Sequence, residues 1–101
     1  MNDETTLCRL QKWYAAHCDG DWEHSWGVKI DTLDNPGWSI FIDLHDTELE
    51  KGSFTGLKVD HPTGWMFCEV KDGQFLGRCG PGGLETMIEV FLKWAGEAAP
   101  R

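Results

Sequence analysis

The stretch WMFCEVKDGQFLGRCG, residues 65–80, carries the clearest local pattern in this chain. Apolar and polar residues alternate on both sides of Asp72-Gly73, a dipeptide that favours two-residue β-hairpin turns. Such a turn pairs Val70 with Phe75 on one face of the hairpin. The alternation predicts a core face of Met66, Cys68, Val70, Phe75 and Cys79 and an opposite face of Trp65, Phe67 and Arg78.

Two further alternating runs lie before this hairpin, on either side of Asn35-Pro36-Gly37. A three-residue loop at that sequence sets Ile30 opposite Ile42 and Lys29 opposite Asp43 on the outer face. A two-residue loop would instead place an aspartate opposite Ile42, and it would turn the apolar side chains to the wrong face. We therefore expect a second antiparallel hairpin with the three-residue loop.

A helix is expected near the start of the chain. Residues 4–18 are predicted to form it, with Asp3 as the N-cap and a break at Gly20. Trp13 is expected at the edge of the apolar stripe. The stripe itself is predicted to consist of Leu7, Leu10, Tyr14 and Cys18.

A second helix is predicted over residues 84–96, where apolar side chains follow the 3.6-residue period and Gly96 is expected to end the helix. A short strand over residues 54–61 completes the set of elements. Short loops make neighbouring strands antiparallel, and both helices need the apolar face of the sheet. We therefore predict an α+β fold, in which a five-stranded, mostly antiparallel meander sheet carries an N-terminal and a C-terminal helix on one face.

The charge of the chain is acidic and unevenly distributed. Its 101 residues, 41% of them hydrophobic, include 17 acidic and 9 basic side chains, for a formal net charge of −8. This composition predicts a single domain over residues 1–101 with an ordered core of about 4–96, and it argues against nucleic acid or membrane as a partner. Residues 1–50 hold 11 of the acidic side chains and only 3 basic ones. A functional interpretation has to account for this asymmetry.

The expected compartment is the cytoplasm. The first ten residues lack the basic and apolar regions of a signal peptide, and no apolar run reaches the roughly 20 residues of a membrane span. Cys8 and Cys18 lie about 15 Å apart if both belong to one helix, which is too far for a disulfide. We expect all four cysteines to be reduced.

The stretch from Cys79 to Glu85, CGPGGLE, is the part of the chain most like an enzyme site. A cysteine before a helix N-terminus can have a lowered pKa, but no basic residue lies in this loop and Cys79 is expected to face the core. Residues 19–23 lack the glycine and glutamate of a calcium loop, and no zinc, phosphate-loop or nucleotide motif occurs. We predict no catalytic, cofactor-binding or metal-binding residues, and no enzyme activity.

Six tryptophans in a chain of this length are unusual. Trp26, Trp38 and Trp94 follow apolar stripes and are expected in the core. Trp22 lies within an acidic run and Trp65 heads the outer face of a hairpin. For these two, burial in the core and contact with a partner protein are both open, because interfaces use aromatic anchors in a polar frame.

Several blocks of the sequence resemble immunity protein family 53 of bacterial polymorphic toxin systems, over about residues 7–95. The blocks that carry the resemblance are LQKWY (10–14), CDGDWEH (18–24), GVKI (27–30), TLDNPGW (32–38), DL (43–44), TEL (47–49) and CGP (79–81). The resemblance implies a small cytoplasmic protein that binds and neutralises a cognate toxin. It implies no catalytic residue.

An acidic inhibitor suits a basic toxin, because charge complementarity speeds association. The expected toxin-binding residues are Asp19, Asp21, Trp22, Glu23, His24, Trp65 and Phe67. For the acidic run, the alternative is that it fixes the connection from helix to strand. Two alternatives for the whole protein are a small thiol-dependent enzyme, sulfurtransferase-like or redox, that uses Cys79, and a homodimer formed through Trp65 and Phe67.

Overall fold

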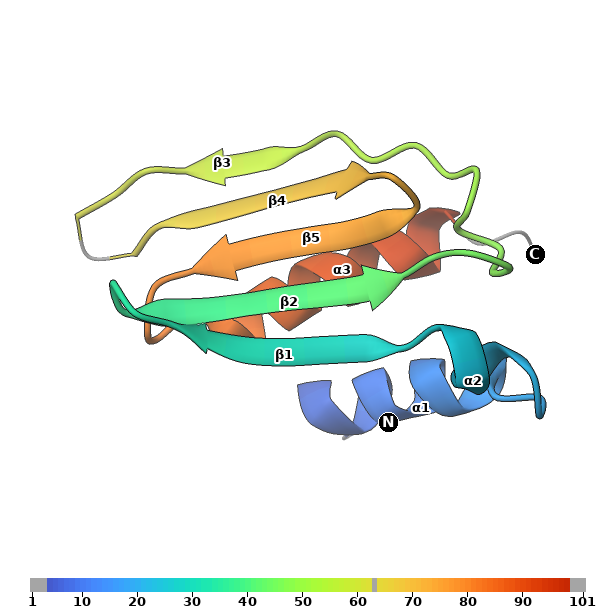
Figure 1. Cartoon of the computed structure of the whole chain (residues 1–101). Helices are drawn as coiled ribbons and strands as arrows, with labels where there is room; N and C mark the ends of the chain where they lie inside the picture. The colour runs from blue at the N-terminus through green and yellow to red at the C-terminus, as the bar shows by residue number, and fades with distance from the viewer. Residues whose placement is uncertain (1–3, 63, 99–101) are drawn as a thin grey trace.

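Five antiparallel strands form one sheet, and two long helices lie on one of its faces (Figure 1). The computed structural model describes residues 4–62 and 64–98. The elements are, in chain order, α1 (Thr6–His17), α2 (Trp22–Ser25), β1 (Val28–Leu33), β2 (Gly37–Asp43), β3 (Leu57–Val59), β4 (Met66–Lys71), β5 (Gln74–Cys79) and α3 (Leu84–Ala98). The predicted α+β architecture with a helix towards each end is confirmed.

The strand order is β1-β2-β5-β4-β3, which differs from a simple meander at one connection. After β2 the chain passes to the far edge, forms β3, and returns through β4 and β5 to pair with β2 (Figure 1). Strands β2 and β5 carry the most deeply buried side chains on the helix side of the sheet. These fully buried residues are Ile40, Ile42, Phe75 and Cys79. Placing β5 beside β2 therefore gathers these side chains under the helices.

The hairpin of β4 and β5 forms as predicted. Val70 pairs with Phe75, and the turn residues Asp72 and Gly73 have φ angles of 53° and 75°. Two successive positive φ values are typical of a type I′ turn, which Asp-Gly favours. The predicted core face is buried, apart from the half-buried Val70.

The hairpin of β1 and β2 has a different register from the predicted one. Ile30 pairs with Ile40 and Lys29 with Phe41, so the predicted pairs with Ile42 and Asp43 are wrong by two residues. A shift of two keeps every side chain on its expected face, which is why alternation alone cannot detect it.

The loop of this hairpin has the predicted three residues, but they are Asp34 to Pro36. Gly37 belongs to β2 and pairs with Leu33. A Cβ atom on Gly37 would lie 2.2 Å from the carbonyl oxygen of Cys79. Close approach of two backbones, and not turn formation, therefore explains the glycine.

Helix α1 begins later and faces differently than predicted. Its N-cap is Thr5, whose Oγ1 accepts a hydrogen bond from the N–H of Cys8 at 3.0 Å, while Asp3 lies outside the described residues. The predicted stripe is wrong except at Leu10, because Leu7 is 61% exposed and Tyr14 and Cys18 are also exposed.

Contacts with α3 explain this orientation of α1. The hydroxyl of Thr6 donates a hydrogen bond to Glu89, and Arg9 Nη1 lies 2.8 Å from Glu89 Oε1. These contacts turn Thr6, Leu10 and Trp13 towards α3 and the core. Trp13 is therefore central to the buried face, and not at its edge as predicted.

Helix α3 covers the sheet with the predicted apolar stripe, but it continues past Gly96 to Ala98. Gly96 is exposed and has open space around it, so nothing there forces the helix to end. Trp94 is buried, and its Nε1 donates a hydrogen bond to the carbonyl oxygen of Ser53 at 2.9 Å.

Trp38 packs half-buried against the core as expected. Trp26, by contrast, precedes β1 and stacks on His45.

Candidate functional site

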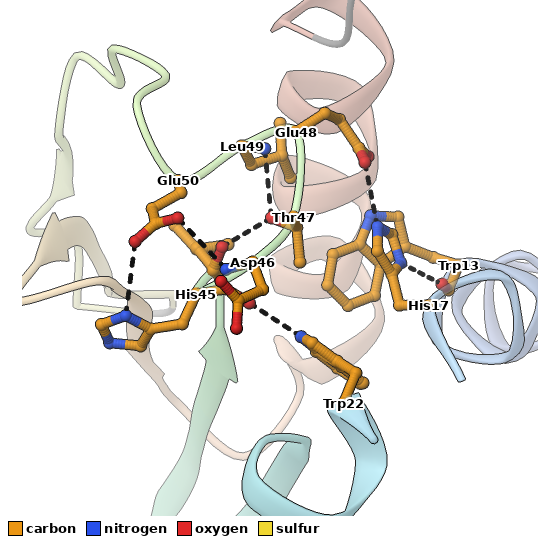
Figure 2. Close-up of polar contacts among 10 residues, drawn as sticks. Trp13, His17, Trp22, His45, Asp46, Thr47, Glu48, Leu49 and Glu50 are labelled. Atoms are coloured by element: carbon orange, nitrogen blue, oxygen red, sulfur yellow. Dashed lines mark hydrogen bonds and ion pairs between the residues drawn. The ribbon is translucent and has the colours of Figure 1, made fainter. Parts of the chain in front are cut away.

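Two acidic segments that are distant in the sequence meet at one end of the sheet (Figure 2). Trp22 Nε1 donates a hydrogen bond to the carbonyl oxygen of His45 at 2.8 Å. Nearby, His17 Nε2 lies 3.0 Å from Glu48 Oε1. We call the six acidic residues on these segments the acidic surface: Asp19, Asp21, Glu23, Asp46, Glu48 and Glu50.

Trp22 lies beneath this surface and is not part of it. Its side chain is only 5% exposed, and its ring lies 6.1 Å from that of Trp13 and 5.6 Å from that of His17. Of the two alternatives that the sequence left open for Trp22, burial in the core is the one observed, and its place among the expected toxin-binding residues is not supported. The short helix α2, which the sequence did not reveal, begins at Trp22 and turns the indole inwards. The indole then links the α1–α2 connection to the segment after β2.

The carboxylates of Asp19 and Glu23 fasten the loop between α1 and α2. Asp19 Oδ1 accepts hydrogen bonds from the N–H groups of Asp21 and Trp22, both at 2.9 Å. Glu23 accepts from the N–H groups of Asp19 at 3.0 Å and Gly20 at 2.9 Å. This arrangement is the one expected if the acidic run fixes the connection from helix to strand.

The same hydrogen bonds lower the pKa of both carboxylates. The N–H groups of Trp22 and Asp21 lower that of Asp19. The pKa of Glu23 is lowered most by its own backbone N–H, and further by the N–H groups of Asp19 and Gly20. Both side chains are therefore held in the charged form by the loop that they organise.

We expect Asp19→Asn to change how stability depends on pH. A carboxylate whose pKa is lowered on folding stabilises the native state above its ordinary value of 3.8, and this contribution is lost as the pH falls further. The wild type should therefore be more stable than the variant at neutral pH, and the difference should shrink in acid. Urea unfolding from neutral pH down to about pH 2 measures it. A difference that stays constant with pH would contradict the role assigned to the charge.

Asp21, His24 and Asp46 are also exposed at this end. Asp21 is the N-cap of α2, but its side chain makes no capping hydrogen bond. Asp46 has a φ of 61°, a conformation that aspartate and asparagine tolerate better than most residues. These side chains are directed to solvent and are available to a partner.

Glu48 is the acidic residue that ties the second segment to α1. Burial raises its pKa, but hydrogen bonds from His17 and from its own backbone N–H outweigh this effect and lower it. His17 Nδ1 also lies 2.8 Å from the carbonyl oxygen of Trp13. His17 thereby bridges the end of α1 and the segment after β2. No sequence signal could have placed Glu48 beside residues 17–23, because only the tertiary structure joins them.

Trp65 and Phe67 lie on a different surface. They are near the start of β4, where Met66 pairs with Cys79, whereas the acidic surface adjoins the opposite end of that strand. Their rings are 5.7 Å apart and both are half-buried. Phe67 lines a shallow depression of about 600 Å³ on the sheet face that the helices leave open. The seven predicted binding residues therefore do not form one surface: Trp65 and Phe67 lie apart from the acidic run, and Trp22 is buried beneath it.

The surroundings of Cys79 do not favour thiol chemistry. Its side chain is fully buried, and burial raises the pKa of its thiol in spite of hydrogen bonds from the backbone of Trp38 and Gly83. A reactive cysteine requires the opposite, a lowered pKa and access to substrate. All four cysteines are free thiols.

Within residues 4–62 and 64–98, no group of three or more His, Cys, Asp or Glu side chains is arranged to hold a metal ion. The same part of the chain contains no helix that is both long and apolar enough to span a bilayer.

The comparisons with known proteins give one match. A family model described as immunity protein 53 matches residues 7–96, which include the whole sheet, α2, all but the first residue of α1 and all but the last two of α3. No curated protein and no solved structure matches the chain.

Proposed function

The chain belongs to the immunity protein 53 family, and on that premise we propose that it binds and neutralises a basic cognate toxin through the acidic surface. The setting we propose is the cytoplasm of a bacterium that carries a polymorphic toxin system. An immunity function against a toxin is what the family implies, and immunity families are in general non-enzymatic. The surface, the charge of the toxin and the location are our proposal.

The observation that carries this proposal is the meeting of residues 19–23 with residues 46–50. The acidic excess of the first half of the chain is thereby concentrated at one end of the sheet. The buried Trp22, which donates to the carbonyl oxygen of His45, and His17, which contacts Glu48, hold the two segments together. Such a rigid charged surface raises the association rate of an oppositely charged partner and reduces the entropy cost of binding.

The acidic residues have different roles in this proposal. Asp19 and Glu23 shape the surface, because their oxygens are bound to backbone N–H groups. Asp21, Asp46 and His24 are exposed and would contact the toxin directly. Trp65 and Phe67 would contribute only if the toxin also reached the open sheet face.

The test combines Asp21→Lys with Asp46→Asn. Together they raise the net charge by three and remove no hydrogen bond that the structure assigns to either side chain. Asparagine tolerates the positive φ of residue 46. The partner to use is a toxin domain sought in the gene next to that of this chain, and calorimetry measures its binding. We expect about tenfold weaker binding at low salt, with the difference decreasing as salt screens the charges.

The matched control combines Asp34→Lys with Glu85→Gln, which makes the same change in net charge. Asp34 lies in the turn between β1 and β2, and Glu85 lies in the first turn of α3. Both are at the end of the sheet opposite the acidic surface (Figure 1). Equal losses in the two double variants would mean that only net charge matters. An unchanged affinity in the first would place the interface elsewhere.

A further inference from the structure

Strand β1 is an edge of the sheet with an unpaired side. It is the first strand in the order β1-β2-β5-β4-β3, so one row of its main-chain groups has no neighbouring strand among residues 4–62 and 64–98 (Figure 1). Lys29, Ile30, Asp31 and Thr32 are all exposed. Ile30 is 38% exposed although it faces the same side as its partner Ile40, which is fully buried. The edge contains no proline and no bulge, and its charged residues, Lys29 and Asp31, have opposite signs, so they repel a second copy only if like charges face each other.

The pairing of β1 with β2 determines which main-chain groups of β1 point to the open edge. The N–H of Asp43 donates to the carbonyl oxygen of Gly27, which makes that opposed pair a hydrogen-bonded one. In an antiparallel ladder such pairs alternate, so Lys29, Asp31 and Leu33 direct their main-chain groups to β2. Those of Val28, Ile30 and Thr32 point to the open edge.

One two-fold symmetric pairing with a second copy gives hydrogen-bond partners to the main-chain groups of Val28, Ile30 and Thr32. With Ile30 opposite Ile30 of the partner subunit, Val28 faces the partner's Thr32, and about six main-chain hydrogen bonds form. Residues that face each other in this register lie on the same side of the sheet, as antiparallel pairing requires.

The same register makes the side chains complementary. Lys29 faces the partner's Asp31 twice, once from each subunit, in the non-hydrogen-bonded pairs where side chains approach most closely. In the free chain, Asp31 Oδ1 instead accepts a hydrogen bond from the N–H of Thr32 at 2.8 Å. Pairing would give that N–H a carbonyl partner and release the carboxylate for the lysine.

We propose that a second copy of this chain pairs antiparallel with the open edge of β1, so that the two sheets join into one continuous sheet around a two-fold axis at Ile30. The interface is isologous, which is the commonest form of protein dimer. It is separate from Trp65 and Phe67, which lie on β4 or just before it. It does not depend on the proposed toxin function, because the contact involves this chain alone.

A charge swap tests the register. In sedimentation and light scattering, the wild type should approach twice the 11.4 kDa of the chain as its concentration rises. Lys29→Asp alone or Asp31→Lys alone creates two like-charged pairs, and each should weaken dimerisation at least about tenfold. The double variant restores two opposite-charge pairs with the signs exchanged, and it should recover most of the affinity.

The control is Lys58→Asp on β3, an exposed lysine on the other edge of the sheet, which should leave dimerisation unchanged. Thermal unfolding confirms that each variant is folded. A wild type that remains at 11.4 kDa up to about 1 mM would overturn the proposal. So would a dimer that both single variants leave intact, or a double variant that fails to recover.

Discussion

Replacing Trp22 with alanine is expected to lower the free energy of unfolding by about 3–5 kcal/mol, which is typical of removing a large buried aromatic side chain. Trp22 is 5% exposed and contacts the rings of Trp13, Tyr14 and His17. A chain of this size is stabilised by roughly 5–15 kcal/mol, so the loss would be a large part of the total. Denaturant unfolding followed by circular dichroism measures it.

Trp22→Phe separates packing from hydrogen bonding. Phenylalanine fills most of the space but leaves the carbonyl oxygen of His45 without its 2.8 Å donor. We expect a loss of about 1–3 kcal/mol, smaller than that of the alanine variant. Trp26→Ala is the matched control, because Trp26 is only half-buried whereas Trp22 is 5% exposed, and it should cost less than Trp22→Ala.

The outcome also distinguishes two roles for Trp22. If Trp22 supports the acidic surface from below, its variants lose stability, and the folded fraction of Trp22→Phe still binds the toxin. If Trp22→Ala unfolds with less than about 1 kcal/mol of loss, the indole is not buried and a direct contact with the partner becomes the better explanation.

The sequence predicted the β4–β5 hairpin and the buried face of α3 correctly, because residues within each element determine them. Asp72-Gly73 fixed both the turn and the register of β4 and β5, because only a two-residue turn fits that dipeptide. The stripe on α3 predicted its buried face correctly. In the first hairpin, two registers that differ by two residues bury the same side chains. The close contact of Gly37 with Cys79 on β5, which favours the observed one, is not visible in the local sequence.

Long-range contacts account for the predictions that were wrong. The face of α1 depends on Glu89, which lies 80 residues beyond Arg9 in sequence. The position of β5 between β2 and β4 depends on joint burial under the helices and not on any one loop.

For the candidate site, residues 19–23 were identifiable as an acidic run, but residues 46–50 lie beside them through tertiary contacts of Trp22 and His17. The sequence left the burial of Trp22 open, because a tryptophan within a polar run can either pack in the core or anchor an interface.

The other large effect concerns the four thiols. Iodoacetamide near neutral pH should label the exposed Cys18 readily, and it should label Cys68 and Cys79 at least about a hundredfold more slowly. Burial raises the pKa of Cys68 to about 11, and burial also raises that of Cys79. Both groups are therefore protonated in the native state and reach the reagent only when the structure opens. Peptide mass spectrometry over a time course reports the four rates separately.

This experiment decides whether the loop before α3 can perform thiol chemistry. Labelling in denaturant is the control, since all four cysteines should then react at similar rates. A nucleophilic cysteine must be accessible and ionised, so slow labelling of Cys79 removes the basis for a sulfur-transfer or redox function. If Cys79 reacted as fast as Cys18, its buried position would be wrong and an enzymatic role would again compete with toxin binding. A Cβ atom added at Gly83 would lie 3.2 Å from Cys79 Sγ, so the glycine loop packs tightly over the thiol. This close packing supports slow labelling.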